Sequence, residues 1–118
     1  MQDMKIRTYL FAVSVGKLIL KLPYTVLNKV YIGQLVKSSS SVGANYRAAR
    51  RAKSDADFLN KLKIVEEEAD ESVYFLELLK EFNGEFNEDI LNLVTEGTEI
   101  LKIIVSSINT TRIKIGNK

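Results

Sequence analysis

The chain has 118 residues, of which 46% are hydrophobic and 27% are charged, which is typical of one folded domain and argues against a disordered chain. It contains no cysteine and no histidine, and this excludes disulfides, thiolate nucleophiles, imidazole bases and most zinc sites. The formal net charge is only +2, and the single proline and six glycines argue against an all-β fold, which needs turn residues at short intervals.

The charge is divided unevenly along the chain. Residues 1–61 carry eleven basic and three acidic residues, whereas residues 62–118 carry six basic and twelve acidic residues. A division of this kind indicates either an anionic partner for the first half or pairing between the two halves, within one subunit or between subunits. The total charge does not separate these two interpretations.

The first expected helix covers about residues 4–22 and ends before Pro23. Its apolar residues recur at helical spacing: Ile6, Tyr9, Leu10, Val13, Gly16 and Leu20. Lysines interrupt this apolar run, no signal-peptidase site follows it, and no segment has the roughly 18 apolar residues of a membrane span. We therefore expect a cytoplasmic protein with no membrane partner.

The second expected helix covers about residues 25–53 and includes the serine run 38–41 and Gly43. Serine and glycine weaken an isolated helix, glycine by about 1 kcal/mol relative to alanine. One helical stripe nevertheless continues straight through the run, a continuity that a loop would not require: Leu27, Tyr31, Leu35, Ser38, Val42, Asn45 and Ala49. The pattern predicts a single long helix, with a bend rather than a break.

The remaining residues predict two more helices, at about 55–82 and 87–110, followed by a polar tail at 111–118. Ser54 and Asp57 have the spacing of a capping box at the start of the first of these. Its seam alternates steps of four and three residues: Phe58, Leu62, Val65, Ala69, Ser72, Leu76 and Leu79. The last helix repeats the pattern with Ile90, Leu93, Gly97, Ile100, Ile104 and Ser107. The sequence thus predicts one all-α domain over residues 1–118, an antiparallel up-down four-helix bundle with a long second helix.

A basic strip is expected on the outer face of the second helix. Five side chains fall within an arc of about 140°, opposite the apolar stripe: Lys29, Lys37, Arg47, Arg50 and Arg51. The strip is about 33 Å long at 1.5 Å per residue, enough to follow a phosphate backbone. Tyr46 lies nearer the apolar side, so we do not assign it as a platform for base stacking.

The alternative interpretation is that the same basic residues form salt bridges with the glutamate-rich third helix of the same or a neighbouring subunit. The protein would then be an interaction or assembly module with no direct nucleic-acid binding. The acidic run at residues 66–71 resembles a metal site, but di-iron bundles also use histidine ligands, which this chain lacks. We therefore expect no metal, no other cofactor and no catalytic residues.

Polar residues also occur on or beside the apolar stripes. We expect them to be hydrogen-bonded, because an unpaired buried hydroxyl or amide costs roughly 1–3 kcal/mol, and to fix helix register or a subunit contact. They are Ser38, Ser41, Asn45 and Ser72.

Four segments carry a pattern more specific than that of a generic bundle. Residues 34–47 read QLVKSSSSVGANYR and residues 51–58 read RAKSDADF. Residues 61–71 read KLKIVEEEADE and residues 74–79 read YFLELL. In these segments, and over nearly its whole length, the chain resembles the bacterial four-helix-bundle family encoded in intervening sequences of 23S ribosomal RNA genes. The resemblance implies an up-down bundle with a long second helix.

That family is in turn similar to the accessory variability determinant of diversity-generating retroelements, whose bundles form a five-membered barrel and associate with a reverse transcriptase and nucleic acid. The resemblance therefore implies a homo-oligomer, a pentamer, with a basic outer surface and a protein partner such as a reverse transcriptase. Many family members carry glutamate three residues after the asparagine, where this chain has Ala48, which makes this face more basic. We predict a non-enzymatic scaffold or accessory factor that binds RNA or DNA.

Overall fold

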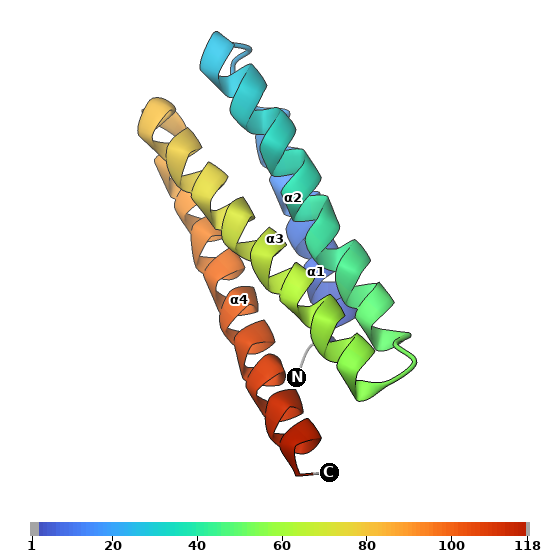
Figure 1. Ribbon diagram of the computed structural model, residues 1–118. Coiled ribbons are helices and arrows are strands. Elements are labelled where there is room, and N and C mark those ends of the chain that lie inside the picture. The colour runs from blue at the N-terminus through green and yellow to red at the C-terminus, as the bar shows by residue number, and fades with distance from the viewer. Residues whose placement is uncertain (1–2, 118) are drawn as a thin grey trace.

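The computed structural model describes residues 3–117 as four α-helices joined by short connections (Figure 1). The elements are α1 (Met4–Ile19), α2 (Val26–Arg50), α3 (Asp55–Phe82), a short 3-10 helix η1 (Gly84–Phe86) and α4 (Asn87–Gly116). The predicted all-α class and up-down bundle are confirmed. Among the described residues, no helix combines the length and apolarity needed to cross a membrane.

The four helices form an elongated bundle of 52 × 21 × 20 Å (Figure 1). Each helix packs against the next one along the chain, and α4 closes the bundle against α1. Within the described residues, neither diagonal pair of helices comes into backbone contact. This is the arrangement expected when short connections make neighbouring helices antiparallel.

The core lies where the predicted seams of α2, α3 and α4 meet. Every seam residue predicted from Leu62 to Leu79 in α3 is buried, and so are the predicted positions from Ile90 to Ile104 in α4. Gly97 is one of these positions, and it admits a close neighbour on each side. A Cβ atom there would lie 3.0 Å from Cγ2 of Val73 and 3.3 Å from Cζ of Phe11.

The first helix differs from its prediction in both its end and its orientation. It ends at Ile19 rather than near residue 22, because the chain tightens into a turn in which the amide of Lys21 donates to the carbonyl of Leu18. Its buried residues are Thr8, Phe11, Val15 and Leu18. The apolar stripe predicted from Ile6 to Leu20 instead faces largely outward, with Leu20 88% exposed.

The second helix passes unbroken through the serine run, as predicted, although it covers Val26–Arg50 rather than 25–53. The hydroxyl of Ser38 donates to the carbonyl of Leu35, and that of Ser39 donates to the carbonyl of Val36. These bonds to the preceding turn satisfy hydroxyls that would otherwise be unpaired beside the core. Ser38 also meets α3, because the hydroxyl of Ser72 donates to its oxygen at 3.0 Å.

The remaining predicted polar residues are also bonded or partly solvated. The side-chain amide of Asn45 donates to the backbone carbonyl of Ser41, and both residues are half-buried. Among the described residues, no buried side-chain nitrogen or oxygen lacks a hydrogen-bond partner. Asn45 therefore bonds within its own helix rather than to a neighbour, whereas Ser38 and Ser72 join two helices.

A buried pair of asparagines that the sequence analysis did not identify joins the start of α2 to the end of α3. The amide nitrogen of Asn28 donates to Oδ1 of Asn83 at 2.7 Å, and that of Asn83 donates back to Oδ1 of Asn28 at 2.8 Å. Asn28 also donates to the carbonyl of Pro23, and Asn83 donates to that of Leu79. The pair thus ties the connection between α1 and α2 to the last turn of α3.

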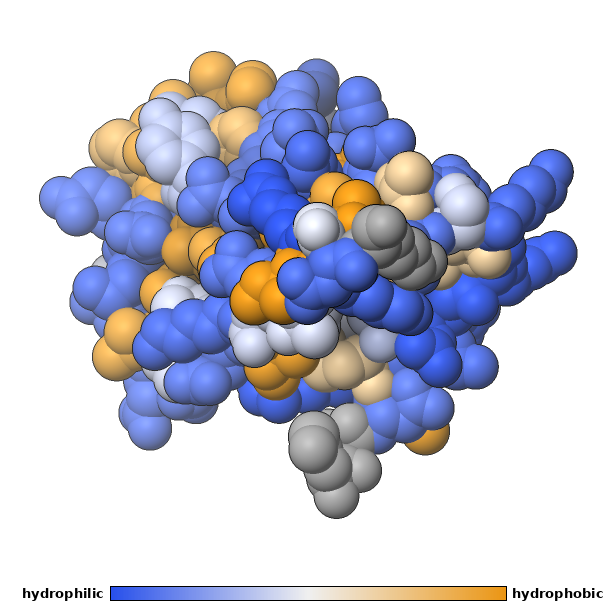
Figure 2. Space-filling model, turned by 60° about the horizontal axis from the view of Figure 1, so that its bottom comes forward, coloured by the Kyte–Doolittle hydropathy of each residue, from blue (hydrophilic) through white to orange (hydrophobic). Residues whose placement is uncertain are grey.

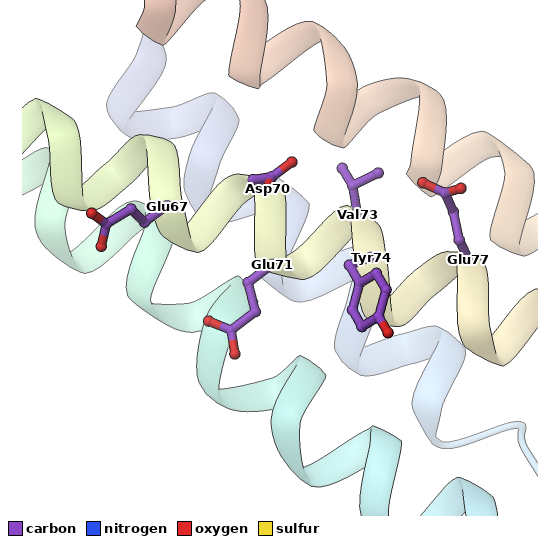
Figure 3. A pocket seen from close by; sticks show the side chains of 6 residues that line it. All are labelled: Glu67, Asp70, Glu71, Val73, Tyr74 and Glu77. Carbon is purple, nitrogen blue, oxygen red and sulfur yellow. The ribbon is translucent and has the colours of Figure 1, made fainter.

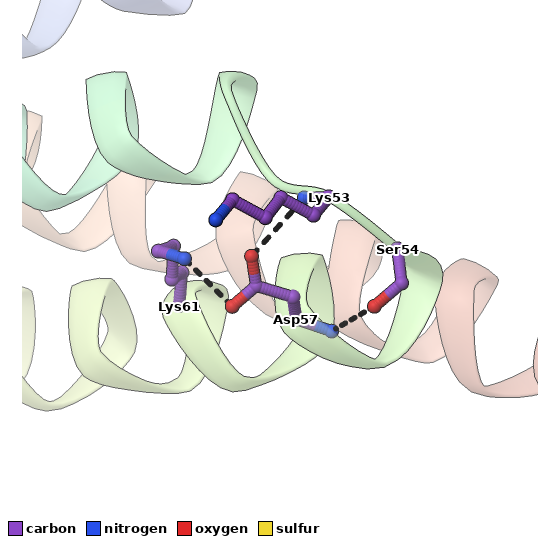
Figure 4. Close-up of polar contacts among 4 residues, drawn as sticks. All are labelled: Lys53, Ser54, Asp57 and Lys61. Carbon is purple, nitrogen blue, oxygen red and sulfur yellow. Dashed lines mark hydrogen bonds and ion pairs between the residues drawn. The ribbon is translucent and has the colours of Figure 1, made fainter.

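The predicted cap of α3 by Ser54 is present, but the carboxylate of Asp57 reaches the backbone amide of Lys53 rather than that of Ser54 (Figure 4). The hydroxyl of Ser54 accepts from the amide of Asp57 at 3.1 Å. The carboxylate of Asp57 accepts from the ammonium of Lys61 at 2.6 Å and from the backbone amide of Lys53 at 3.1 Å (Figure 4). The bond from Lys61, assisted by that from Lys53, holds the pKa of Asp57 below its usual value. α3 therefore begins at Asp55, where the sequence predicted it.

The polar tail predicted at 111–118 is wrong as far as residue 117, because α4 continues to Gly116, and Lys118 lies outside the described residues. Thr111 is buried and its hydroxyl donates to the carbonyl of Ser107. One turn further, the ammonium of Lys114 lies 3.3 Å from the carboxylate of Asp55 at the start of α3. The segment is polar in composition, but it continues the helix and contacts its neighbour.

Candidate nucleic-acid interface

All five basic side chains predicted on the outer face of α2 are exposed, and their surroundings differ along the helix. The ammonium of Lys29 lies 5.9 Å from the centre of the Tyr24 ring, near the start of the helix. Lys37 lies close enough to Glu68 of α3 that its charge lowers the pKa of that carboxyl, against the larger opposing effect of burial. The three arginines form a separate group at the other end of α2.

These arginines share a groove with the start of α1. The groove has a volume of about 880 Å³. Its lining comes from both helices: Asp3, Lys5, Ile6, Tyr9, Leu10, Arg47, Arg50 and Arg51. Figure 2 views the molecule with this end of the bundle brought forward, and hydrophilic residues cover most of the surface with hydrophobic residues exposed among them.

The helices α1 and α2 approach each other closely beside this groove. A Cβ atom on Gly43 would lie only 3.3 Å from Oγ1 of Thr8, so glycine lets the backbones of α1 and α2 come near each other. Arg47 lies one turn after Gly43, and Lys5 and Tyr9 lie on either side of Thr8 in the sequence. These three side chains also line a smaller adjoining hollow of about 280 Å³. The glycine in the weak-helix segment therefore has a packing role.

The groove carries an excess of positive charge. Within residues 3–117, Arg47, Arg50 and Arg51 form no ion pair. The carboxylate of Asp3 also lines the groove, where it caps α1 by accepting from the amide of Lys5 at 2.8 Å. The arginines at the end of α2 also favour the helix itself, because cations stabilise the negative end of a helix dipole. Four cations thus share the groove with a single carboxylate.

The other wall of the groove is apolar and aromatic. Tyr9 is 55% exposed, Ile6 52% and Leu10 45%, and all three line the groove. The sequence predicts these residues on the apolar stripe of the first helix, with no relation to the basic group. They lie beside the arginines because α1 buries a different face, which contains Thr8 and Phe11.

An acidic groove lies on a different face of the bundle, along α3 (Figure 3). Its volume is about 420 Å³, and its lining is Glu67, Asp70, Glu71, Val73, Tyr74 and Glu77. Within residues 3–117, no three acidic side chains converge closely enough to hold a metal ion. Burial raises the pKa of the neighbouring Glu68, and the charge of Glu71 raises it further. This face therefore complements the basic groove in charge.

The sequence model of the family described as "23S rRNA-intervening sequence protein" matches residues 3–106, which is most of the chain. The chain belongs to this family. The match extends through α1, α2 and α3 and into α4, so it includes both walls of the basic groove.

A solved member of the S23 ribosomal protein family, from Bacteroides thetaiotaomicron VPI-5482, is similar to this 23S rRNA-intervening sequence protein in sequence and in fold. The two are 35% identical, with a TM-score of 0.78, and the match covers 90% of this chain and 98% of the solved one. That protein is described as having unknown function. No curated protein matches the chain.

Proposed function

We propose that the protein is a non-enzymatic scaffold or accessory factor that binds nucleic acid through the basic groove. The observation that carries this proposal is the convergence of Arg47, Arg50, Arg51 and Lys5 on one groove with a single carboxylate. Exposed guanidinium groups without carboxylate partners suit bidentate contacts to phosphate oxygens. The names of the family and of its solved relative refer to ribosomal RNA and ribosomal proteins.

The test is a fluorescence-anisotropy titration of labelled RNA and DNA oligonucleotides over a range of salt concentrations. The variant Arg47→Ala/Arg50→Ala/Arg51→Ala is compared with the wild type. For a single strand, each lost phosphate contact is expected to make the slope of log K against log salt shallower by about 0.7. The triple variant is therefore expected to bind more weakly, with a slope shallower by about two.

The matched control removes the same charge elsewhere. Lys17, Lys21 and Lys102 are exposed and do not line the groove, so the variant Lys17→Ala/Lys21→Ala/Lys102→Ala is expected to keep most of the affinity. Equal losses in both triple variants would show that overall charge, rather than the groove, controls binding. No salt-sensitive binding by the wild type would overturn the proposal.

A second candidate function, as an assembly or protein-interaction module, is supported by the acidic groove on α3. In this proposal the basic groove of one copy binds the acidic face of another, and the bundle is a homo-oligomer, with five copies by family resemblance. Multi-angle light scattering on the arginine triple variant tests it. A lower mass for the variant, without nucleic-acid binding by the wild type, would favour assembly.

A further inference from the structure

We infer that the basic groove selects single-stranded nucleic acid and stacks one base on the ring of Tyr9. This inference rests on the proposed function and adds the class of ligand and the residue that selects it. A groove that bound only phosphates would gain nothing from an apolar wall. Tyr9, Ile6 and Leu10 each expose about half of their surface beside the arginines.

The two forms of nucleic acid differ in what they present to this wall. A duplex presents phosphates and sugars on its outside, with its base faces stacked inside. A single strand exposes the flat faces of its bases, which stack on aromatic side chains while a basic groove follows the backbone. The combination of an exposed tyrosine with unpaired arginines therefore matches a single strand.

Tyr9 is suited to this role because its ring is free. Within residues 3–117 it makes no ring contact, whereas the ring of Tyr24 lies beside the ammonium of Lys29 and the ring of Tyr74 lies 5.4 Å from that of Phe75. Tyr74 also lies in the acidic groove, where a phosphate backbone would be repelled. Tyr9 is thus an exposed tyrosine with arginine neighbours and an open ring.

The spacing of the charges fits a base in this position. Arg47 and Lys5 line both hollows that Tyr9 lines, so the phosphates flanking a stacked base lie within reach of both cations. From Arg47 to Arg51 the chain rises only about 6 Å along the axis of α2, so the arginines face a short length of backbone. One copy of the chain therefore holds a short stretch of the strand.

The experiment compares four oligonucleotide probes of equal length over the same range of salt concentrations: single-stranded RNA, single-stranded DNA, duplex DNA, and a single strand with abasic sites. The proteins are the wild type, Tyr9→Ala, Tyr9→Phe and, as the control, Tyr24→Ala, whose side chain is 80% exposed. Because Tyr9 lies outside the core, its variants are expected to fold. Circular dichroism and light scattering check folding and mass.

The wild type is expected to bind single strands more tightly than the duplex. Tyr9→Ala is expected to weaken single-strand binding about 5- to 150-fold, the equivalent of 1–3 kcal/mol per stacked base, with an unchanged salt slope. Tyr9→Phe and Tyr24→Ala are expected to bind as the wild type does, and the abasic probe is expected to bind weakly. The RNA and DNA probes show which sugar is preferred.

Three results would overturn the inference, and each is distinct. Equal affinity for duplex and single strand, unchanged in Tyr9→Ala, would mean that only phosphates are bound, and the proposed function would survive. A change of mass in Tyr9→Ala without a change in binding would assign this wall to a contact between copies. Absence of binding to every probe would overturn the proposed function as well.

Discussion

The replacement Asn28→Ala tests how much the buried asparagine pair contributes to stability. Asn28 is 1% exposed and Asn83 is 7% exposed, so water has little access to either. The replacement removes three side-chain hydrogen bonds, one to Pro23 and two shared with Asn83. It also leaves Oδ1 of Asn83 without its donor.

The expected magnitude follows from the unpaired groups rather than from the lost contacts. A typical hydrogen bond contributes about 0.5–1.5 kcal/mol net, whereas a buried group left without a partner costs about 1–3 kcal/mol. Asn83 retains its bond to Leu79, which limits the loss on that side. We expect Asn28→Ala to lower the free energy of unfolding by about 2–4 kcal/mol.

The assay is urea denaturation followed by circular dichroism. All variants are measured at the same protein concentration, because the stability of an assembled protein depends on its concentration. The double variant Asn28→Ala/Asn83→Ala is expected to lose less than the sum of the single variants, with a coupling of about 0.5–3 kcal/mol. Asn60→Ala, at an exposed position of α3, is the control. A loss below about 1 kcal/mol, or strictly additive losses, would refute the reasoning.

Three further replacements test the packing and the electrostatics of the bundle. Gly97→Val is expected to destabilise the protein by about 1–3 kcal/mol, because its Cβ would meet Val73 and Phe11 at 3.0 and 3.3 Å. Gly33→Ala, whose Cβ would meet nothing within 4 Å, is expected to stabilise the protein by about 0.5–1 kcal/mol. Urea midpoints that shift in the same direction in both variants would contradict this. Glu68→Gln is expected to stabilise the protein at pH 7, because burial raises the pKa of Glu68 above its ordinary 4.5 and the folded state therefore disfavours the carboxylate. That gain is expected to vanish as the pH falls below about 4.5, where the carboxyl is protonated in both states, and an equal gain at pH 7 and pH 3.5 would exclude this cause.

The sequence predicted the helices most reliably where a seam repeats over several turns. α3 is the clearest case, because its seam residues and its cap at Ser54 both agree with the structure. α1 was harder, because it has apolar residues on more than one face. Thr8 belongs to the buried face, where its hydroxyl donates to the carbonyl of Met4. The buried face of α1 therefore contains a polar residue.

Features that join distant parts of the chain could not be read from the sequence. Asn28 and Asn83 are 55 residues apart, and neither lies in a sequence motif that predicts the other as its hydrogen-bond partner. The arginines of the groove were predicted from one helix, but Tyr9 comes from another. Its relation to Arg47 depends on how α1 is rotated against α2, which packing decides. The end of α4 was missed because its anchors, Thr111 and Lys114, are polar.

The closure of α1 against α4 has a consequence for the order of folding. The guanidinium of Arg7 donates to both carboxylate oxygens of Glu96 across 89 residues of chain, whereas the hydroxyl contact between α2 and α3 spans 34 residues. Closing the longer loop costs about 0.9 kcal/mol more in chain entropy. We therefore expect the hairpin of α2 and α3 to form before α1 docks, and the amides of α1 to exchange with solvent earliest in native-state hydrogen exchange.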